Sequence, residues 1–562
     1  MNIRIGAMTL LLMVSSLFCS AQDKTFRHIV GRDINSSDVR AQVRARQRLG
    51  VPQLSAKADL KLLPQLPTGT DWAVSVGLPP MGFNQWPMTW PYTSTSPSCS
   101  DYAVFPTTGT PAVGGQANLV ILNNLYRGAG PGVCGTGAAT VQAAYAVGTT
   151  GSLGAPTASF KGASKGLKIG LVEHNTAVVH IITVGTGGTV SNAVAPTETT
   201  IDYTNITNAH CTAGTVHTAN HSDFWVDYAT DEGYASDDAG KIYHFTGVFN
   251  GTPTMDFCTT INGGAWAGLP EHVNFAGTDY IFFISNGKRL YRAQVNATRT
   301  AFTGATNLIL DSGTNNIVDD ILIDIDIPAA YVWTSRNAAG TQASEYQVTG
   351  LAGGTLTIAA ELRLGPAITT PGGVVGAYLM GEMDDVYWSG TNFAGATGYT
   401  CVYPNGSAGA PRLASYTFNA SGTIAGYTAM SDTNGNNNIN PGSGTTTGNV
   451  CTDVIEVHDV TAGVDQLFVA TGNGNQANAN RLSRWDITSP ITNFLATPTA
   501  NVVNIYGGSS RIVIDNVDSG LGLQTQNLYF GDLSPSTVTS KCGGTAPNTN
   551  ACAIKLQQAG LN

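Results

Sequence analysis

The chain has 562 residues, with 27 Lys and Arg against 37 Asp and Glu, and its formal net charge is −10. Only 11% of the residues are charged, and 66 are Gly, a composition typical of an exported β protein with many turns. The acidic balance excludes nucleic acid and anionic membrane surfaces as expected partners.

Residues 1–21 are predicted to be a secretory signal peptide. Arg4 supplies the positive end, residues 8–18 supply an apolar run, and small residues at 19–21 suit cleavage before Gln22. The run is too short to span a bilayer, and no later stretch resembles a transmembrane segment. A lipoprotein anchored through Cys19 is the alternative, but the bulky Phe18 before it argues against this. We therefore expect a secreted, periplasmic or extracellular protein.

Two segments precede the main body of the chain. Residues 22–65 form a basic leader, predicted to be helical or disordered, because residues 36–48 contain helix formers after an N-cap candidate. A pro-segment or a surface tether is the functional alternative for this leader. Residues 66–98 are rich in Pro, Trp and Thr and are predicted to be an extended strap. From residue 62 onward the net charge is −16.

Residues 99–562 repeat one hairpin pattern about eight times. The clearest copy, Glu232 to Phe245, reads as an apolar strand, a turn rich in Asp and Gly, and a second strand. A hairpin repeated about eight times along the chain predicts an all-β fold, a single β-propeller of eight or seven four-stranded blades. The first unit lacks an inner strand and the last lacks an outer one, so a strand from residues 72–91 is expected to close the ring. A β-helix and a pair of β-sandwiches are the alternative folds.

The segment Ser236-Asp-Asp-Ala-Gly-Lys-Ile-Tyr-His-Phe245, with Trp266 after it, resembles the repeats of quinoprotein-type (PQQ-like) β-propellers. The resemblance implies the architecture of residues 100–560. Active members hold the quinone near adjacent cysteines, and haem-bearing relatives carry Cys-x-x-Cys-His. This chain has neither motif, so we expect neither PQQ nor haem as a cofactor.

Eight cysteines remain after the signal peptide, and an even count in an exported chain predicts disulfides. They fall as neighbours in the sequence, although eight cysteines allow 105 full pairings. The expected pairs are Cys99 with Cys134, Cys211 with Cys258, Cys401 with Cys451, and Cys542 with Cys552.

Two segments contain metal-ligand types. Asp432, Asn434 and Asn436 alternate as oxygen ligands do at the start of a Ca²⁺-binding loop, although Asn437 and Ser443 depart from that pattern. The alternative is a plain polar loop. His210, His217 and His221 lie close in sequence, with Asp223 beside them, and could bind Zn²⁺ or Cu²⁺. His174 and His180 are expected to be structural.

Carboxylate pairs occur at three places, with two further acids near the second: Asp237-Asp238, Asp319-Asp320 with Asp324 and Asp326, and Asp384-Asp385. Paired acids can run glycoside hydrolysis, but acids at hairpin turns commonly accept bonds from backbone N–H groups. We expect the capping role. No catalytic residue, therefore, is assigned from the sequence.

The residues leave three functions open. The first is a non-enzymatic binding or scaffold module for a protein or glycan, acting through loops at one face of the propeller. The second is an extracellular enzyme, either a carbohydrate-active hydrolase or lyase or a cofactor-dependent oxidoreductase. The third is a surface-assembly protein tethered by the leader. The ligand and the oligomeric state are not determined by the sequence.

Overall fold

The computed structural model of the protein describes the following segments of the chain. These are residues 70–77, 80–82, 85–90, 97–128, 133–159, 162–203, 206, 210–211, 223–227, 230–237, 240–260, 270–275, 277–285, 289–310, 321–324, 327–334, 339, 342–366, 381–384, 386–387, 392–402, 412–428, 450–459, 464–472, 481–489, 500–504, 509–516, 526–533 and 551–557. The predicted signal peptide and leader lie outside these segments.

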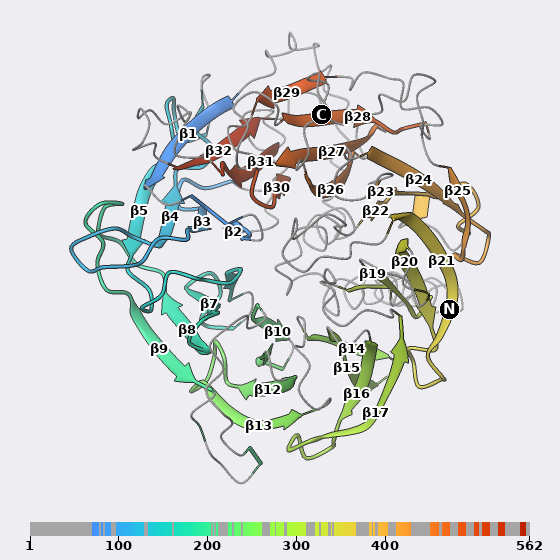
Figure 1. The fold of residues 1–562 in the computed structure, drawn as a ribbon. Coiled ribbons are helices and arrows are strands. Elements are labelled where there is room, and N and C mark those ends of the chain that lie inside the picture. Colours follow the sequence, from blue (N-terminus) through green and yellow to red (C-terminus); the bar gives the residue numbers. More distant parts are fainter. Residues whose placement is uncertain are drawn as a thin grey trace, which may run out of the picture.

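The described strands form eight antiparallel sheets of four strands each, arranged as blades around a ring (Figure 1). The prediction of an all-β propeller is confirmed, and the blade number is eight rather than seven. The alternatives of a β-helix and paired sandwiches are wrong, because the described strands form eight separate four-stranded sheets around one ring (Figure 1).

Each blade contains an inner, a second, a third and an outer strand. In blades 1 to 8, the inner strands are β2 (Met88–Trp90), β6 (Thr157–Ala158), β10 (Trp225–Asp227), β14 (Glu271–Phe275), β18 (Leu322–Asp324), β22 (Glu382–Met383), β26 (Val450–Asp459) and β30 (Val513–Asn516). The second strands are β3 (Tyr102–Pro106), β7 (Lys168–Glu173), β11 (Glu232–Ser236), β15 (Thr278–Ser285), β19 (Ala329–Thr334), β23 (Thr397–Val402), β27 (Val464–Gly472) and β31 (Gln526–Gly531). The third strands are β4 (Leu119–Asn123), β8 (Val178–Thr183), β12 (Lys241–Thr246), β16 (Arg289–Val295), β20 (Gln342–Thr349), β24 (Arg412–Phe418), β28 (Arg481–Asp486) and β32 (Ala551–Gln557). The outer strands are β5 (Thr140–Tyr145), β9 (Thr197–Asp202), β13 (Thr254–Thr260), β17 (Phe302–Ile309), β21 (Thr357–Pro366), β25 (Ile424–Thr428), β29 (Ala500–Asn504) and β1 (Thr70–Gly77).

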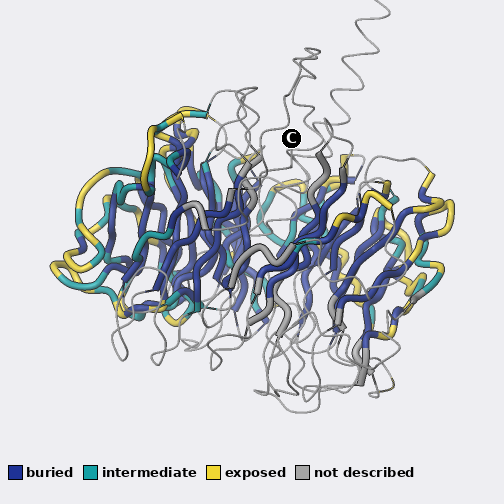
Figure 2. Tube along the Cα trace, turned by 90° about the horizontal axis from the view of Figure 1, so that it is seen from above, coloured by how far each residue is buried: buried dark blue, intermediate teal, exposed yellow. Residues whose placement is uncertain are grey.

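Burial decreases from the second strand of a blade to its outer strand. Every residue of β3, β11 and β19 is buried, because these strands are covered on both faces by neighbouring blades. The outer strand β17 is mostly exposed. Seen edge-on, buried strands fill the body of the disc and exposed residues lie at the loops and the rim (Figure 2).

The ring closes through the N-terminal part of the described chain. Strand β1 pairs antiparallel with β32, with Trp72 opposite Lys555, so it is the outer strand of blade 8 (Figure 1). The indole of Trp72 is buried, and its Nε1 donates to the carbonyl of Leu125 in blade 1 at 3.3 Å. Strand β2 then starts blade 1, so this one segment supplies both strands that the first and last units lack.

Long side chains fasten several blades to the backbone of the next one. Lys168 Nζ in blade 2 donates to the carbonyl of Phe249, which lies between β12 and β13, at 2.7 Å. Gln347 Nε2 in blade 5 donates to the Gly422 carbonyl at 2.7 Å, in the turn before β25. Lys555 Nζ in blade 8 reaches the Arg127 carbonyl in blade 1 at 2.9 Å. In each of these contacts the acceptor lies between the third and outer strands of the following blade.

Candidate functional site: buried histidine and carboxylate clusters

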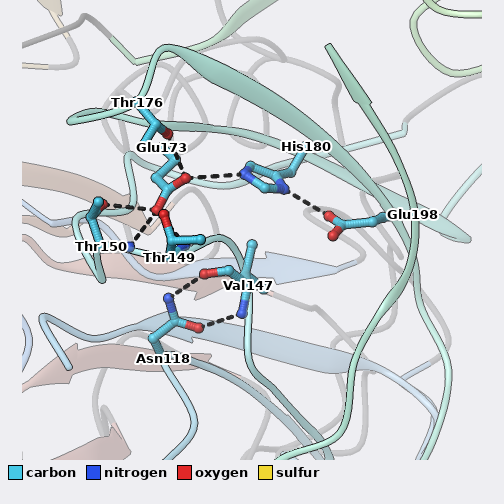
Figure 3. Close-up of polar contacts among 8 residues, drawn as sticks. All are labelled: Asn118, Val147, Thr149, Thr150, Glu173, Thr176, His180 and Glu198. Carbon is cyan, nitrogen blue, oxygen red and sulfur yellow. Dashed lines mark hydrogen bonds and ion pairs between the residues drawn. The ribbon is translucent and has the colours of Figure 1, made fainter. Parts of the chain in front are cut away.

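Glu173, His180 and Glu198 form a cluster in blade 2, in which Glu173 and His180 are buried and Glu198 is part-buried (Figure 3). They lie in β7, β8 and β9, so three neighbouring strands each supply one side chain. The Nδ1 atom of His180 lies 2.7 Å from Glu198 Oε2, and its Nε2 atom lies 3.8 Å from Glu173 Oε2. Both ring nitrogens therefore face a carboxylate.

Glu173 also joins blade 2 to the segment that leaves blade 1. Its Oε1 atom accepts hydrogen bonds from the backbone N–H groups of Thr149 and Thr150, at 2.7 and 2.6 Å, and from the Thr150 hydroxyl at 2.8 Å. Gly148 has a φ of 64°, and a Cβ atom there would lie 2.4 Å from Glu173 Cδ. Only glycine fits this close approach.

Asn118 supports the same segment from the other side (Figure 3). Its side-chain amide donates to the Val147 carbonyl and accepts from the Val147 N–H, both at 2.8 Å. The side chain thus supplies the pair of hydrogen bonds that a neighbouring strand would give, and it holds the backbone that Glu173 caps.

The cluster in blade 2 favours charged groups. Burial raises the pKa of Glu173, but the neighbouring His180 and hydrogen bonds from Thr176 and from the amides of Thr149 and Thr150 outweigh it and hold that pKa far below its usual range. Burial lowers the pKa of His180, but the nearby Glu173 and the hydrogen-bonded Glu198 outweigh it and raise that pKa. The carboxylates and the imidazolium therefore stabilise one another.

A second cluster of the same kind occurs in blade 3. His244 Nδ1 lies 2.6 Å from Asp256 Oδ1, and its Nε2 lies 3.4 Å from Glu232 Oε2. As in blade 2, the histidine is on the third strand and its carboxylates are on the second and outer strands. Arg299, from the turn between β16 and β17 of blade 4, forms an ion pair with Glu232.

A third histidine connects two blades. His272 on β14, in blade 4, has its Nδ1 3.1 Å from Asp227 Oδ2 on β10, in blade 3. Its Nε2 lies 3.3 Å from Asp279 Oδ1 on β15. Burial lowers the pKa of His272, but hydrogen bonds to Asp227 and Asp279 outweigh it and raise the pKa to about 9. This histidine is charged at neutral pH.

These clusters join strands and blades. Each histidine is buried and has a carboxylate beside each ring nitrogen, so its ring is enclosed by partners inside the protein. Within the segments described above, no group of three or more His, Cys, Asp and Glu side chains is arranged to hold a metal ion. The arrangement can hold polar and ionisable side chains inside the ring and link neighbouring blades.

The acids that the sequence identified as hairpin caps have that role where they are described. Asp237 Oδ1 accepts the Lys241 N–H at 2.8 Å, and its Oδ2 accepts the Tyr243 hydroxyl at 2.7 Å. Asp384 accepts the N–H groups of Tyr387 and Thr397 at 3.0 and 2.9 Å. The capping prediction is confirmed for these two acids. Five other acids of the three groups lie outside the described residues: Asp238, Asp319, Asp320, Asp326 and Asp385.

The remaining acid of that group has a different partner. Asp324, at the end of β18 in blade 5, accepts the hydroxyl of Tyr387 in blade 6 at 2.8 Å. The Tyr387 hydroxyl also lies 2.6 Å from the Tyr331 hydroxyl, so this acid takes part in a contact that joins two blades.

The metal-ligand candidates from the sequence are largely untested. Asp432, Asn434 and Asn436 lie outside the described residues, as do His217 and His221. His210 is described, is exposed, and accepts the Cys258 N–H at its backbone carbonyl at 3.3 Å. Calcium and transition-metal binding stay predictions.

Two of the four predicted disulfides are present among the described residues. Cys99 bonds Cys134 with a Cα–Cα distance of 5.5 Å, and Cys211 bonds Cys258 at 4.8 Å. Cys552 is also disulfide-bonded, and its predicted partner Cys542 lies outside the described residues. These bonds indicate an oxidising compartment. No helix within the described residues is long and apolar enough to cross a membrane.

Sequence reasoning missed a buried acid between blades 5 and 6. Glu345 on β20 is fully buried, its Oε1 accepts the Tyr416 hydroxyl at 2.7 Å, and its Oε2 has no hydrogen-bond partner. Burial raises its pKa to about 8, against the lowering effect of the hydrogen bond from Tyr416. The local sequence carried little signal, because β20 contains Gln, Ser and Thr beside this acid.

We expect Glu345→Gln to stabilise the protein in alkaline solution. The folded-state pKa is raised, so the stability linked to this carboxyl is full below its unfolded pKa of about 4.5 and is lost as pH rises through about 8. Glutamine can still accept the Tyr416 hydroxyl and never ionises. Chemical denaturation at several pH values should show that the variant loses less stability than the wild type as pH rises from about 4.5 to about 8. A variant with the same pH slope as the wild type would contradict this.

No family model matches the chain, and no curated protein sequence matches it. Solved structures of propellers do match. The Dos1 propeller is 9% identical, covers 87% of this chain and 94% of its own, and has a TM-score of 0.43. Sqt1 from Chaetomium thermophilum is 10% identical, covers 82% and 97%, and has a TM-score of 0.41. A protein from Lactobacillus plantarum is 14% identical, covers 72% and 97%, and has a TM-score of 0.37. At these identities the likeness concerns the fold alone, and membership of the quinoprotein-type superfamily stays a prediction.

Proposed function

We propose that the protein is an exported propeller that binds a protein or a glycan through loops at one face, without catalysing a reaction. The observation that supports this proposal is the use of the buried histidines. His180, His244 and His272 are each held between two carboxylates inside the ring. Groups committed in this way stiffen a scaffold and are not free to act on a substrate.

The ends of the strands offer rigid positions for recognition. Leu167, in the turn before β7, is 55% exposed although its N–H and carbonyl are both hydrogen-bonded to Ser164 and Val184. The neighbouring Gly166 packs on the indole of Trp90. An exposed apolar side chain on a fixed turn is suited to a binding face, since little conformational entropy is lost when a ligand packs on it.

The test is a glycan array together with pull-down from an extracellular extract, using the secreted protein with its disulfides intact. We expect a specific ligand and loss of its binding in Leu167→Asp. Val113→Asp is the matched control, because Val113 is 69% exposed in the loop between β3 and β4, at the opposite end of the strands. Turnover of a substrate panel with no ligand retained on either assay would overturn the proposal.

A further inference from the structure

The inner strands of blades 3 and 4 meet at a buried charged contact. We define the blade 3–4 seam by Asp227 on β10, Tyr234 on β11, and His272 and Asp279 on β14 and β15. Asp227 and His272 are 7% and 5% exposed, and Tyr234 is fully buried. The strands β10 and β14 follow one another around the ring (Figure 1).

The geometry of His272 requires a particular protonation state. Its two nitrogens lie 3.1 and 3.3 Å from carboxylate oxygens of Asp227 and Asp279, and a carboxylate only accepts hydrogen bonds. A neutral imidazole has one N–H donor, whereas an imidazolium has two. Both contacts can therefore be hydrogen bonds only when His272 is protonated.

Among the described residues, the side chains paired with His272 or packed on its ring are acids and aromatic rings. Tyr234 stacks on His272 with ring centroids 5.7 Å apart, and its buried hydroxyl has no hydrogen-bond partner. Trp225 meets the His272 ring edge-on, also at 5.7 Å. Asp279 further accepts a hydrogen bond from Asn274 at 2.6 Å, and Asp227 accepts one from Thr230 at 3.0 Å. Arg299 of blade 4 is paired with Glu232.

We propose that the blade 3–4 seam is a pH-sensitive lock, in which protonated His272 ties Asp227 of blade 3 to Asp279 of blade 4 and loss of that proton loosens the seam. The proposal concerns the ring and is independent of the proposed binding function. His180 and His244 differ from His272, because each lies between carboxylates of its own blade.

The direction of the response follows from linkage. The pKa of His272 is raised to about 9 in the folded protein. Its contribution to the stability of the seam is therefore full below the unfolded pKa of about 6.5 and is lost as pH rises through about 9. Deprotonation also leaves the seam one charge more negative. An apolar cluster lies next to it, formed by Trp225, Tyr234, Ile242, Ile281, Phe283 and Tyr291. Loosening exposes this cluster to solvent.

The experiment is hydrogen exchange of peptides from β10 and β14, measured near pH 6 and near pH 9 and corrected for the intrinsic exchange rate. The protein used, called the parent here, carries Glu345→Gln. This substitution removes the separate loss of stability that ionisation of Glu345 causes at the interface of blades 5 and 6 as pH rises. We expect protection at the seam to fall by about tenfold or more between these pH values, while β3 and β7 change less. Equal corrected protection at both pH values in this parent protein would overturn the proposal, whatever the variants do.

Two variants separate the lock from ordinary destabilisation. His272→Gln should lower seam protection already near pH 6 and abolish its pH response, because glutamine does not titrate. His180→Gln is the matched control, since it removes a buried histidine from the interior of blade 2, and the seam response should persist. A seam that responds to pH equally in His272→Gln and in the parent would also overturn the proposal.

Discussion

Trp72→Ala is expected to lower the free energy of unfolding by about 3–5 kcal/mol, the usual cost of truncating a buried tryptophan. The indole is 4% exposed, packs 5.9 Å from the Tyr529 ring of blade 8, and donates to Leu125 of blade 1. It therefore anchors the closing strand to both ends of the ring. Chemical denaturation followed by circular dichroism measures the loss.

Val74→Ala is the control for this variant, because Val74 lies on the same strand and is only half-buried. We expect its effect to be about 1 kcal/mol or less. A Trp72→Ala effect no larger than that of Val74→Ala would mean that pairing of β1 with β32, rather than the indole, holds the ring closed.

Glu173→Ala is expected to cost about 3–5 kcal/mol, because it removes one partner of a buried ionic cluster and leaves the others without compensation. Two backbone N–H groups at Thr149 and Thr150 lose their acceptor, and His180 loses one of its two carboxylates. Glu173→Gln keeps an acceptor for the amides and should cost less. The free energies of unfolding of both variants at neutral pH check the order.

Acid titration separates the ionic contribution of Glu173 from its role as hydrogen-bond acceptor for the amides of Thr149 and Thr150. The pKa of Glu173 is lowered in the folded state, so its contribution is present above the unfolded value and is lost as pH falls below about 4.5. Glu173→Gln should flatten that acid slope. Glu198→Ala is the control, since it removes the other carboxylate beside His180 and leaves the amides of Thr149 and Thr150 capped. Equal losses in Glu198→Ala and Glu173→Ala would contradict the capping role of Glu173.

The predicted hairpins and the structure agree because the signal was local. In the copy from Glu232 to Phe245, two apolar runs around a turn rich in Asp and Gly predict two strands, and Asp237 caps the turn between them. Both depend on residues only a few positions apart in the chain. The same reasoning anticipated that His180 is structural, although not its partners Glu173 and Glu198.

Contacts between blades could not be read from the chain. Asp227 and His272 are 45 residues apart, and Thr149 and Glu173 belong to different blades. Nothing in either local pattern indicates such a partner. An acid followed by histidines on successive predicted strands was a usable hint, since it recurs in blades 2 and 3, but strand register is needed to show which side chains meet.

The sequence alone determined that this protein is a ring of repeated hairpins, closed by a strand from the N-terminal strap, because strand composition, turn residues and repeat length can be read along the chain. Cysteine spacing likewise predicted the bonds of Cys99 to Cys134 and of Cys211 to Cys258. Tertiary structure decided that there are eight blades, that the strap supplies both β1 and β2, and that the buried histidines hold carboxylates together. Those outcomes depend on register and on which faces pack together, which bring together residues far apart in the chain.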